Sequence, residues 1–268
     1  MSQPPRPRPG RSERRPRAID NPIQLTDEEI ARVRAMVIHE DDEIVVLNKP
    51  SGLSSQGGRI KEHTLDELLW AFARSNGNRP RLVHRLDRDT SGVILTGRTK
   101  PAAGYLGKAV MARKLKKTYW AIVTPGAPQP RAGEITVALR REEIGWEAYI
   151  RPCADDHPDA QASRSLYRTL AATEEAALLE LNPVTGRMHQ LRVHLAHIGR
   201  PIAGDVRYGG ALSVGGLGVP RLMLHARSLS FPHPDGSGMK TMEAPIPADF
   251  AELAEKLGLR EPQASPAR

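Results

Sequence analysis

Most of the apolar sequence in this 268-residue chain falls into short runs of strand length. The runs are rich in valine, isoleucine, leucine and aromatic residues and are bounded by polar or proline-containing loops, which is typical of β-strands. They cover residues 43–48, 93–97, 118–123, 134–139, 165–171, 176–181 and 221–225. The runs outnumber the helical segments and do not alternate regularly with them. We therefore predict an α+β fold with a largely antiparallel mixed β-sheet flanked by helices and loops.

Two helices are predicted from capping boxes, in which a threonine is followed three positions later by a glutamate. Thr26 with Glu29 opens a helix to about residue 36, and Thr64 with Glu67 opens a second one. Further helices are expected near 101–113, 188–198 and 248–258.

The helix expected at 188–198 has one buried face. Met188, Leu191, Leu195 and Ile198 are spaced three, four and three apart, as on one side of a helix. Arg192 borders this stripe, where an arginine either pairs with a carboxylate or extends its head into water. The glycine-rich stretch 206–220 follows, which we expect to be a mobile loop.

The positive charge of the chain is concentrated at its beginning. The net charge is +8, and residues 1–18 hold six arginines against one glutamate, which leaves only +3 for the rest. Because five prolines lie in the same stretch, we expect a disordered basic arm over 1–25, before a catalytic domain over 26–260 and a flexible tail over 261–268. Such an arm indicates a polyanionic partner, most simply nucleic acid, or else a solubilising tail.

Composition also limits the cellular setting. No apolar run approaches the roughly 18 residues of a membrane span, and the beginning of the chain lacks the apolar stretch of a secretory signal. Cys153 is the single cysteine, so no internal disulfide can form, as in proteins of reducing compartments. We expect a cytoplasmic protein without a membrane partner, and a monomer.

The segment richest in reactive side chains is His84-Arg85-Leu86-Asp87-Arg88-Asp89-Thr90-Ser91-Gly92, between two strand-like runs. Turn formation explains residues 89–92. It does not explain His84, Arg85 and Asp87, which stand beside an apolar flank and should be partly buried. A carboxylate there needs a paired cation or a reactive role.

Two other kinds of chemistry are weaker alternatives. A metal site would use His189, His194 and His197 with Asp87 or Asp205, but His189 and His194 lie five apart and do not share a helix face. The chain has no H-E-x-x-H motif and no cysteine pair. A Ser/His/Asp hydrolase would use Ser91, which does not stand in a G-x-S-x-G elbow. We therefore expect no metal.

Four blocks of the chain, in order, resemble the RluA family of RNA pseudouridine synthases. Residues 84–92 match the family's H-R-L-D-x-x-T-S-G signature, and Lys117-Thr118-Tyr119 is similar to its K-x-Y element. The stretches 186–194 and 199–205 resemble a third block, and 221–225 a fourth. The similarity spans about residues 39–250.

The resemblance implies an isomerase with a pseudouridine synthase-like core that converts uridine in RNA to pseudouridine without a cofactor or metal. Asp87 would be the nucleophile, at the anomeric carbon of the ribose or in a glycal-type elimination. Tyr119 would stack on the flipped base and is the family's candidate for removing the proton from carbon 5. Arg192 would be the salt-bridge partner that keeps Asp87 ionised. Candidates for RNA contacts are His84, Arg85, Arg88, Lys49, Arg187 and His189.

The substrate is less closely defined. Many members of the family carry a small RNA-binding domain before the catalytic core, for which 1–25 is too short, so the basic arm is expected to take its place. Both large-subunit ribosomal RNA and transfer RNA are family substrates, and we favour ribosomal RNA slightly. The rival interpretations are a non-catalytic RNA-binding paralogue and a metal-dependent hydrolase.

Overall fold

The computed structural model of the protein describes residues 23–57, 63–75, 77–145 and 147–260. Most of the expected basic arm and all of the expected tail therefore lie outside the described residues. No helix among the described residues is long and apolar enough to cross a bilayer.

The helices begin where capping predicts them. Thr26 caps α1 (Asp27–Arg34) and Thr64 caps α2 (Leu65–Leu68), each in a complete capping box. A 3₁₀ turn, η1 (Leu69–Phe72), continues α2. The remaining helices are α3 (Lys100–Met111), α4 (Gln190–His197) and α5 (Ala248–Lys256).

A ten-stranded mixed sheet forms the centre of the molecule, which confirms the predicted α+β class. Its main order is β1-β2-β4-β13-β5-β10-β9-β6, with β3 paired to β4 and β14 to β13. Only β4 and β13 run parallel among the paired strands of this sheet in the described residues. The strands are β1 (Val37–Glu40), β2 (Ile44–Lys49), β3 (Arg81–Leu82), β4 (Ser91–Gly97), β5 (Lys116–Val123), β6 (Ala132–Thr136), β9 (Arg164–Ala172), β10 (Ala177–Pro183), β13 (Leu224–Pro232) and β14 (Met239–Glu243).

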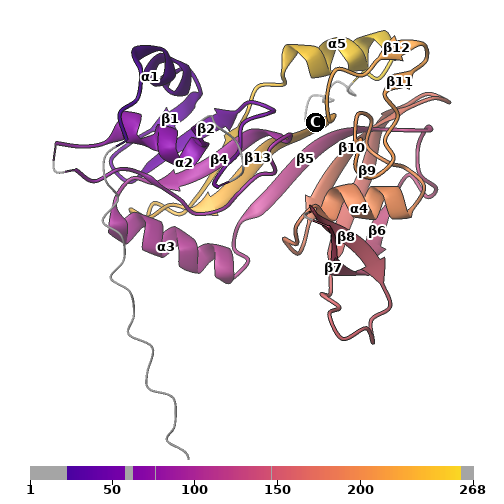
Figure 1. Ribbon diagram of the computed structural model, residues 1–268, viewed down its shortest axis with the longest axis horizontal. Coiled ribbons are helices and arrows are strands. Elements are labelled where there is room, and N and C mark those ends of the chain that lie inside the picture. Colours follow the sequence, from indigo (N-terminus) through magenta and orange to yellow (C-terminus); the bar gives the residue numbers. More distant parts are fainter. Residues whose placement is uncertain (1–22, 58–62, 76, 146, 261–268) are drawn as a thin grey trace, which may run out of the picture.

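The sheet joins two lobes, with α1, α2 and α3 around β1, β2 and β4 in one, and α4 and α5 near β5, β9 and β10 in the other (Figure 1). In the first lobe both faces of β2 are buried. Val45 and Leu47 belong to the main core with the side chains of α1 and α2, whereas Ile44 and Val46 pack in a second core with Leu106 of α3. This two-sided cover explains why β2 and β4 are apolar without alternation.

Strand register brings Tyr119 next to the Asp87 loop. Ala226 of β13 pairs with Gly92 of β4 on one side and with Tyr119 of β5 on the other. Gly92 has φ +117°, and a Cβ atom there would lie only 2.2 Å from the carbonyl oxygen of Ala226. The glycine is therefore required for β4 and β13 to pair directly after the loop.

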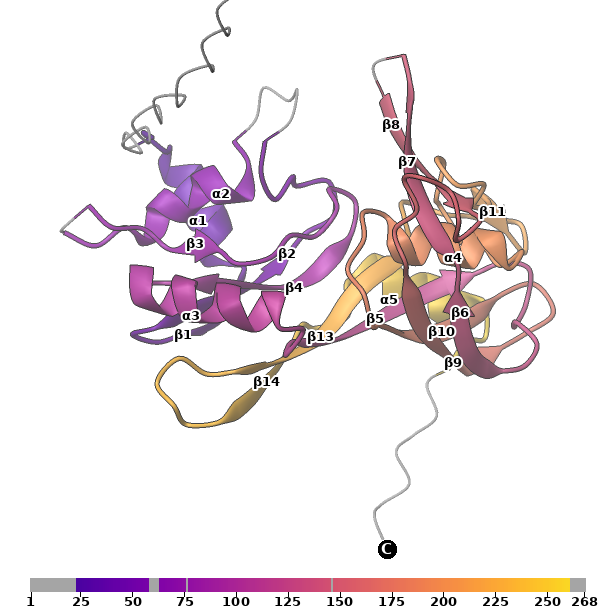
Figure 2. The same ribbon diagram turned by 90° about the horizontal axis from the view of Figure 1, so that it is seen from below.

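Several elements differ from the sequence predictions. Residues 37–40 form a strand, β1, and the run expected at 134–139 is divided between β6 and β7. β7 (Ala138–Ile144) and β8 (Glu147–Cys153) form a separate hairpin that projects from the second lobe (Figure 2). Within the stretch expected to be a mobile loop, β11 (Ser213–Val214) pairs with β12 (Leu217–Gly218).

The prediction for Met188 was wrong. This side chain is 41% exposed and precedes α4, which begins at Gln190. His189 has φ 51°, in the left-handed region, so the helix cannot extend back through it. Leu191 and Leu195 are buried as expected.

Candidate active site

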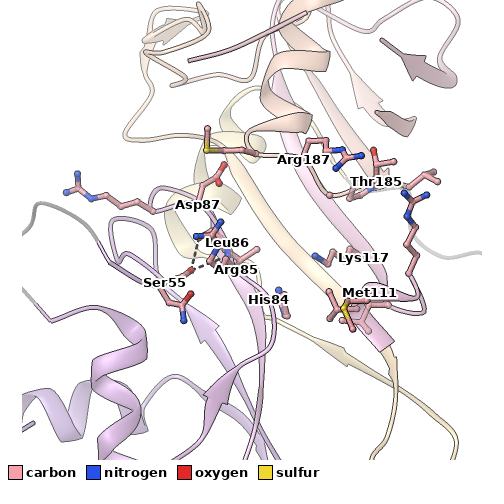
Figure 3. A pocket seen from close by; sticks show the side chains of 18 of the residues that line it. Ser55, His84, Arg85, Leu86, Asp87, Met111, Lys117, Thr185 and Arg187 are labelled. Atoms are coloured by element: carbon pink, nitrogen blue, oxygen red, sulfur yellow. Dashed lines mark hydrogen bonds between the residues drawn. The ribbon is translucent and has the colours of Figure 1, made fainter. Parts of the chain in front are cut away.

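The loop between β3 and β4 carries Asp87, and hydrogen bonds from residues 49–55 fix its backbone. The Ser55 hydroxyl donates to the Leu86 carbonyl at 2.7 Å and accepts from the Leu86 N–H at 3.1 Å (Figure 3). The Gly52 N–H donates to the carbonyl of Arg88 at 3.0 Å. These bonds fix the backbone on both sides of Asp87.

Lys49 belongs to this support rather than to an RNA-binding surface. It is fully buried, and its Nζ donates to the carbonyls of Pro50, Leu53 and Arg88 at 2.8–2.9 Å. Three carbonyl acceptors match the three protons of an ammonium group. Burial lowers the pKa of Lys49 to about 7, against the opposing effect of Asp89 and Asp87. The predicted phosphate contact of Lys49 therefore does not fit this position.

His84 is likewise an internal residue. Its Nε2 accepts a hydrogen bond from the backbone N–H of Leu95 at 3.0 Å, which anchors the loop to β4. Burial, with a smaller contribution from the charge of Lys117, lowers the pKa of His84 to about 3, so the ring is neutral. A neutral imidazole whose acceptor nitrogen is engaged is a poor phosphate ligand, and the predicted RNA contact of His84 is not supported.

Asp87 faces two side chains of the second lobe. Its Oδ2 lies 3.9 Å from a terminal nitrogen of Arg192 and 4.0 Å from Nε2 of His189. The carboxylate is 31% exposed, and within the described residues it accepts no hydrogen bond. The absence of short contacts within the described residues leaves the oxygen lone pairs of Asp87 available for attack.

Arg192 is held mainly by Asp205. Its Nε and one terminal nitrogen donate to the two carboxylate oxygens of Asp205 at 2.8 and 2.7 Å. The Asp205 side chain is fully buried and Arg192 nearly so. Burial alone would lower the pKa of Arg192, but the hydrogen bonds and charge of Asp205, with that of Asp87, raise it. The sequence prediction paired Arg192 with Asp87, whereas the structure shows an arginine that bridges two carboxylates.

Tyr208 completes this arrangement. The guanidinium of Arg192 lies 5.0 Å from the centre of its ring, and the Tyr208 hydroxyl is 2.7 Å from Nδ1 of His189. The backbone N–H of Tyr208 donates to Asp205 at 3.2 Å. Burial lowers the pKa of His189, so its imidazole is neutral at pH 7. The turn 205–208 thus holds both side chains that face Asp87.

Gly204 makes the turn possible. Its φ is +78°, and a Cβ atom would lie 1.9 Å from the carbonyl oxygen of Arg221. Any other residue would displace the turn that carries Asp205.

A cavity of about 120 Å³ is lined by Asp87, Tyr119, Leu191, Arg192 and Leu224 among others. Burial and then the negative charge of Asp87 raise the pKa of Tyr119. The phenol therefore keeps its proton while Asp87 is ionised.

A second, larger cavity of about 520 Å³ adjoins the first. Exposed arginines at the entrance include Arg85 and Arg187, which line both cavities, and Arg88, which lines the larger one (Figure 3). His189 lines the smaller one. Their predicted contacts with RNA remain predictions.

The histidines of the metal hypothesis are separated. Nε2 of the buried His194 lies 2.7 Å from the hydroxyl of Ser163, whereas His189 meets Tyr208. Within the described part of the chain, no three histidine, cysteine, aspartate or glutamate side chains are grouped so as to hold a metal ion.

Sequence reasoning placed Asp87, Tyr119 and Arg192 around one site, and the structure brings them together. It considered Asp205 only as a metal ligand and did not consider Tyr208. The position of Asp205 after Gly204, in a block that resembles the family, was the available signal for the first. Tyr208 lies in a stretch without periodicity, and nothing in the sequence indicated its contact with Arg192.

A family model, related sequences and solved structures that match this chain are those of RNA pseudouridine synthases. Residues 43–197 match the family model described as RNA pseudouridylate synthase. The ribosomal large subunit pseudouridine synthase C of Vibrio parahaemolyticus is 34% identical over 235 residues, which cover 87% of this chain and 71% of that protein. The protein of the same name from Escherichia coli is 34% identical over 252 residues, covering 92% and 76%.

A mitochondrial pseudouridylate synthase of Xenopus tropicalis is 32% identical, over 87% of this chain and 83% of its own length. Among solved structures, human RNA pseudouridylate synthase domain containing 4 superposes with a TM-score of 0.74 at 28% identity, covering 88% of this chain and 99% of that one. With the family model, the relatives and the fold in agreement, the chain belongs to the RluA-type RNA pseudouridine synthases, which are isomerases acting on RNA.

Proposed function

We propose that this protein isomerises uridine to pseudouridine in large-subunit ribosomal RNA, with Asp87 as the nucleophile. The observation that carries the proposal is the carboxylate of Asp87, which accepts no hydrogen bond from the described residues, lies 3.9 Å from Arg192 and lines a small cavity with Tyr119 and Arg192. A base flipped out of its stack would enter this cavity, as in other enzymes that modify bases.

The chemistry follows from the placement of the groups. Asp87 attacks the anomeric carbon, or serves an elimination at the ribose, and the bond from that carbon to N1 of uracil breaks. The uracil turns within the cavity and its C5 bonds to the same carbon, as the ester bond to Asp87 breaks or, in the elimination route, as the ribose regains its proton. The C5 proton is then removed, and N1 takes up a proton. If Asp87 forms the ester, its negative charge is lost, and with it one of the two causes that raise the pKa of Tyr119. We propose Tyr119, which lines the cavity, as the group that removes the C5 proton.

The choice of RNA rests on the relatives, two of which are named for the large ribosomal subunit. Single-nucleotide mapping of pseudouridine in total RNA from cells with and without the gene tests it. We expect the loss of one or a few sites in large-subunit ribosomal RNA. Losses confined to transfer RNA would overturn the choice of RNA, and no loss anywhere would favour the non-catalytic paralogue.

We also propose that the reaction uses neither metal nor cofactor and that the enzyme is a cytoplasmic monomer. The unpaired Cys153 suits a reducing compartment. Activity in excess chelator, with RNA folding maintained by monovalent salt, tests the first point. Activity that only zinc restores would favour the hydrolase. Light scattering tests whether the protein is a monomer, and cell fractionation tests whether it is cytoplasmic.

A further inference from the structure

The two cavities at the active site share a wall on β5. Tyr119 lines the smaller cavity, and Val110 and Met111 at the C-terminal end of α3 line the larger. Lys117 lines both of them and lies where they join. In Figure 3 it projects from β5 into the space between the Asp87 loop and the segment of Thr185 and Arg187.

Among the residues that the structure describes, the ammonium group of Lys117 has no counter-charge. Within the described residues it forms neither a hydrogen bond nor an ion pair, in contrast to the ammonium of Lys49, which three carbonyls satisfy. Burial lowers the pKa of Lys117, and no nearby carboxylate opposes the effect. A largely desolvated cation without a partner is costly to the protein. Such a group is explained if an anion pairs with it in the functional complex.

The larger cavity also presents an apolar wall. Met111 is 78% exposed, and Met188 and Val184 are each 41% exposed. All three residues line the larger cavity, as do Ser54, Ser55 and Gln56. Methionine side chains adapt to flat surfaces such as the face of a base. A cation and exposed apolar side chains in one cavity match the phosphate and base of a nucleotide.

We propose that the larger cavity seats the nucleotide next to the target uridine, and that Lys117 pairs with the phosphate that joins the two. This inference rests on the proposed function and deepens it. It makes Lys117 a positioning residue, because it fixes the backbone beside the flipped nucleoside and touches no reacting atom.

The test uses RNA oligonucleotides that contain the mapped uridine, each with one neutral methylphosphonate at the linkage before or after it. Lys117→Met removes the charge and keeps an unbranched side chain. Lys116→Met is the matched control, since Lys116 precedes it on β5, is exposed and lines neither cavity. Lys117→Arg restores the charge. Thermal unfolding of each variant shows that it is folded.

For the wild-type enzyme we expect one of the two methylphosphonates to raise KM about tenfold, the effect of a lost charge-assisted contact. Lys117→Met should show that rise on unmodified RNA, should be indifferent to the same methylphosphonate, and should reduce the slope of log affinity against log salt by about 0.7. Lys116→Met should behave as wild type, and Lys117→Arg should recover most of the affinity.

The inference is overturned if Lys117→Met remains as sensitive to both methylphosphonates as wild type, or if its salt slope is unchanged. The same binding measurements in an Asp87→Asn background need no turnover. An enzyme that forms no pseudouridine would therefore contradict the proposed function and would still leave the phosphate contact to be decided by binding.

Discussion

The guanidinium of Arg192 donates two hydrogen bonds to Asp205 and lies 3.9 Å from Asp87 with its remaining terminal nitrogen. The buried Arg192–Asp205 pair thus fixes the position of the guanidinium, and this positive charge lies beside Asp87. This arrangement separates stability from reactivity, because Asp205 satisfies the arginine, and in the described part of the chain the oxygens of Asp87 have no contact shorter than the 3.9 Å to Arg192.

Substitutions should therefore couple more strongly between Arg192 and Asp205 than between Arg192 and Asp87. Removing one member of a buried pair typically costs about 3–5 kcal/mol, so Arg192→Ala or Asp205→Asn should lower the free energy of unfolding by that amount. The double variant should lose less than the sum. Urea unfolding of the singles and doubles measures both couplings. Additive losses for Arg192 and Asp205, with coupling only to Asp87, would contradict the structure.

Tyr119 should affect turnover more than binding. Tyr119→Phe keeps the ring against the base and removes the hydroxyl. We expect kcat to fall by about 10²–10⁴, as for the loss of a general base, with RNA affinity within a few-fold of wild type. Tyr119→Leu should lose affinity as well. Single-turnover rates and binding titrations distinguish these effects. Full activity of Tyr119→Phe would remove the proton-transfer role and leave stacking alone.

Asp41 should contribute stability that depends on acid pH. Burial would raise its pKa, but hydrogen bonds from His39, His233 and the backbone N–H groups of Glu43 and Ile44 lower it to about 2. Because the pKa in the folded state lies below the unfolded value near 4, the stabilisation is complete above pH 4 and is lost as the pH falls through 2.

Asp41→Asn should therefore cost about 1–2 kcal/mol at neutral pH, after allowance for solvent screening, and should flatten the stability curve between pH 4 and pH 2. Urea unfolding at a series of pH values checks this. An unchanged slope in that window would show that the carboxylate is not held as described.

The basic arm should add affinity without choosing the site. Residues 1–18 carry six arginines and no aromatic side chain. If all six contact single-stranded RNA, deletion of the arm should flatten the slope of log affinity against log salt by roughly four. The modified position should stay the same, since base readout needs fixed geometry. Titrations across a salt series, beside pseudouridine mapping, decide between this role and a solubilising tail.

The sequence predicted the helices and strands whose formation depends on residues close together along the chain. Both capping boxes form, and the apolar runs of β2, β4 and β5 are strands because two-sided burial requires apolar residues in succession. The β7–β8 hairpin was missed because β7 carries a run of charged residues instead of an apolar one, and the side chains of Arg141 and Glu143 are 59% and 70% exposed.

The sequence predicted which residues lie together in the site, but it did not predict the contacts that hold them there. Lys49 was predicted to contact RNA because it is charged, but tertiary contacts with distant segments bury it completely. Partial burial was expected for His84, but its hydrogen bond with the backbone N–H of Leu95 was not. The bond between Arg192 and Asp205 depends on a turn at Gly204 that local pattern does not specify. Long-range packing, which no single stretch of sequence encodes, determines these roles.

The rate of pseudouridine formation by Asp87→Asn on the mapped RNA tests the central claim most directly. The substitution removes the nucleophile and keeps the shape, so we expect the single-turnover rate to fall about a thousandfold or more while the Kd for RNA stays similar. Asp89→Asn is the matched control, because that carboxylate is exposed and lines neither cavity. Substantial turnover by an Asp87→Asn protein whose sequence is verified by mass spectrometry would contradict the assignment.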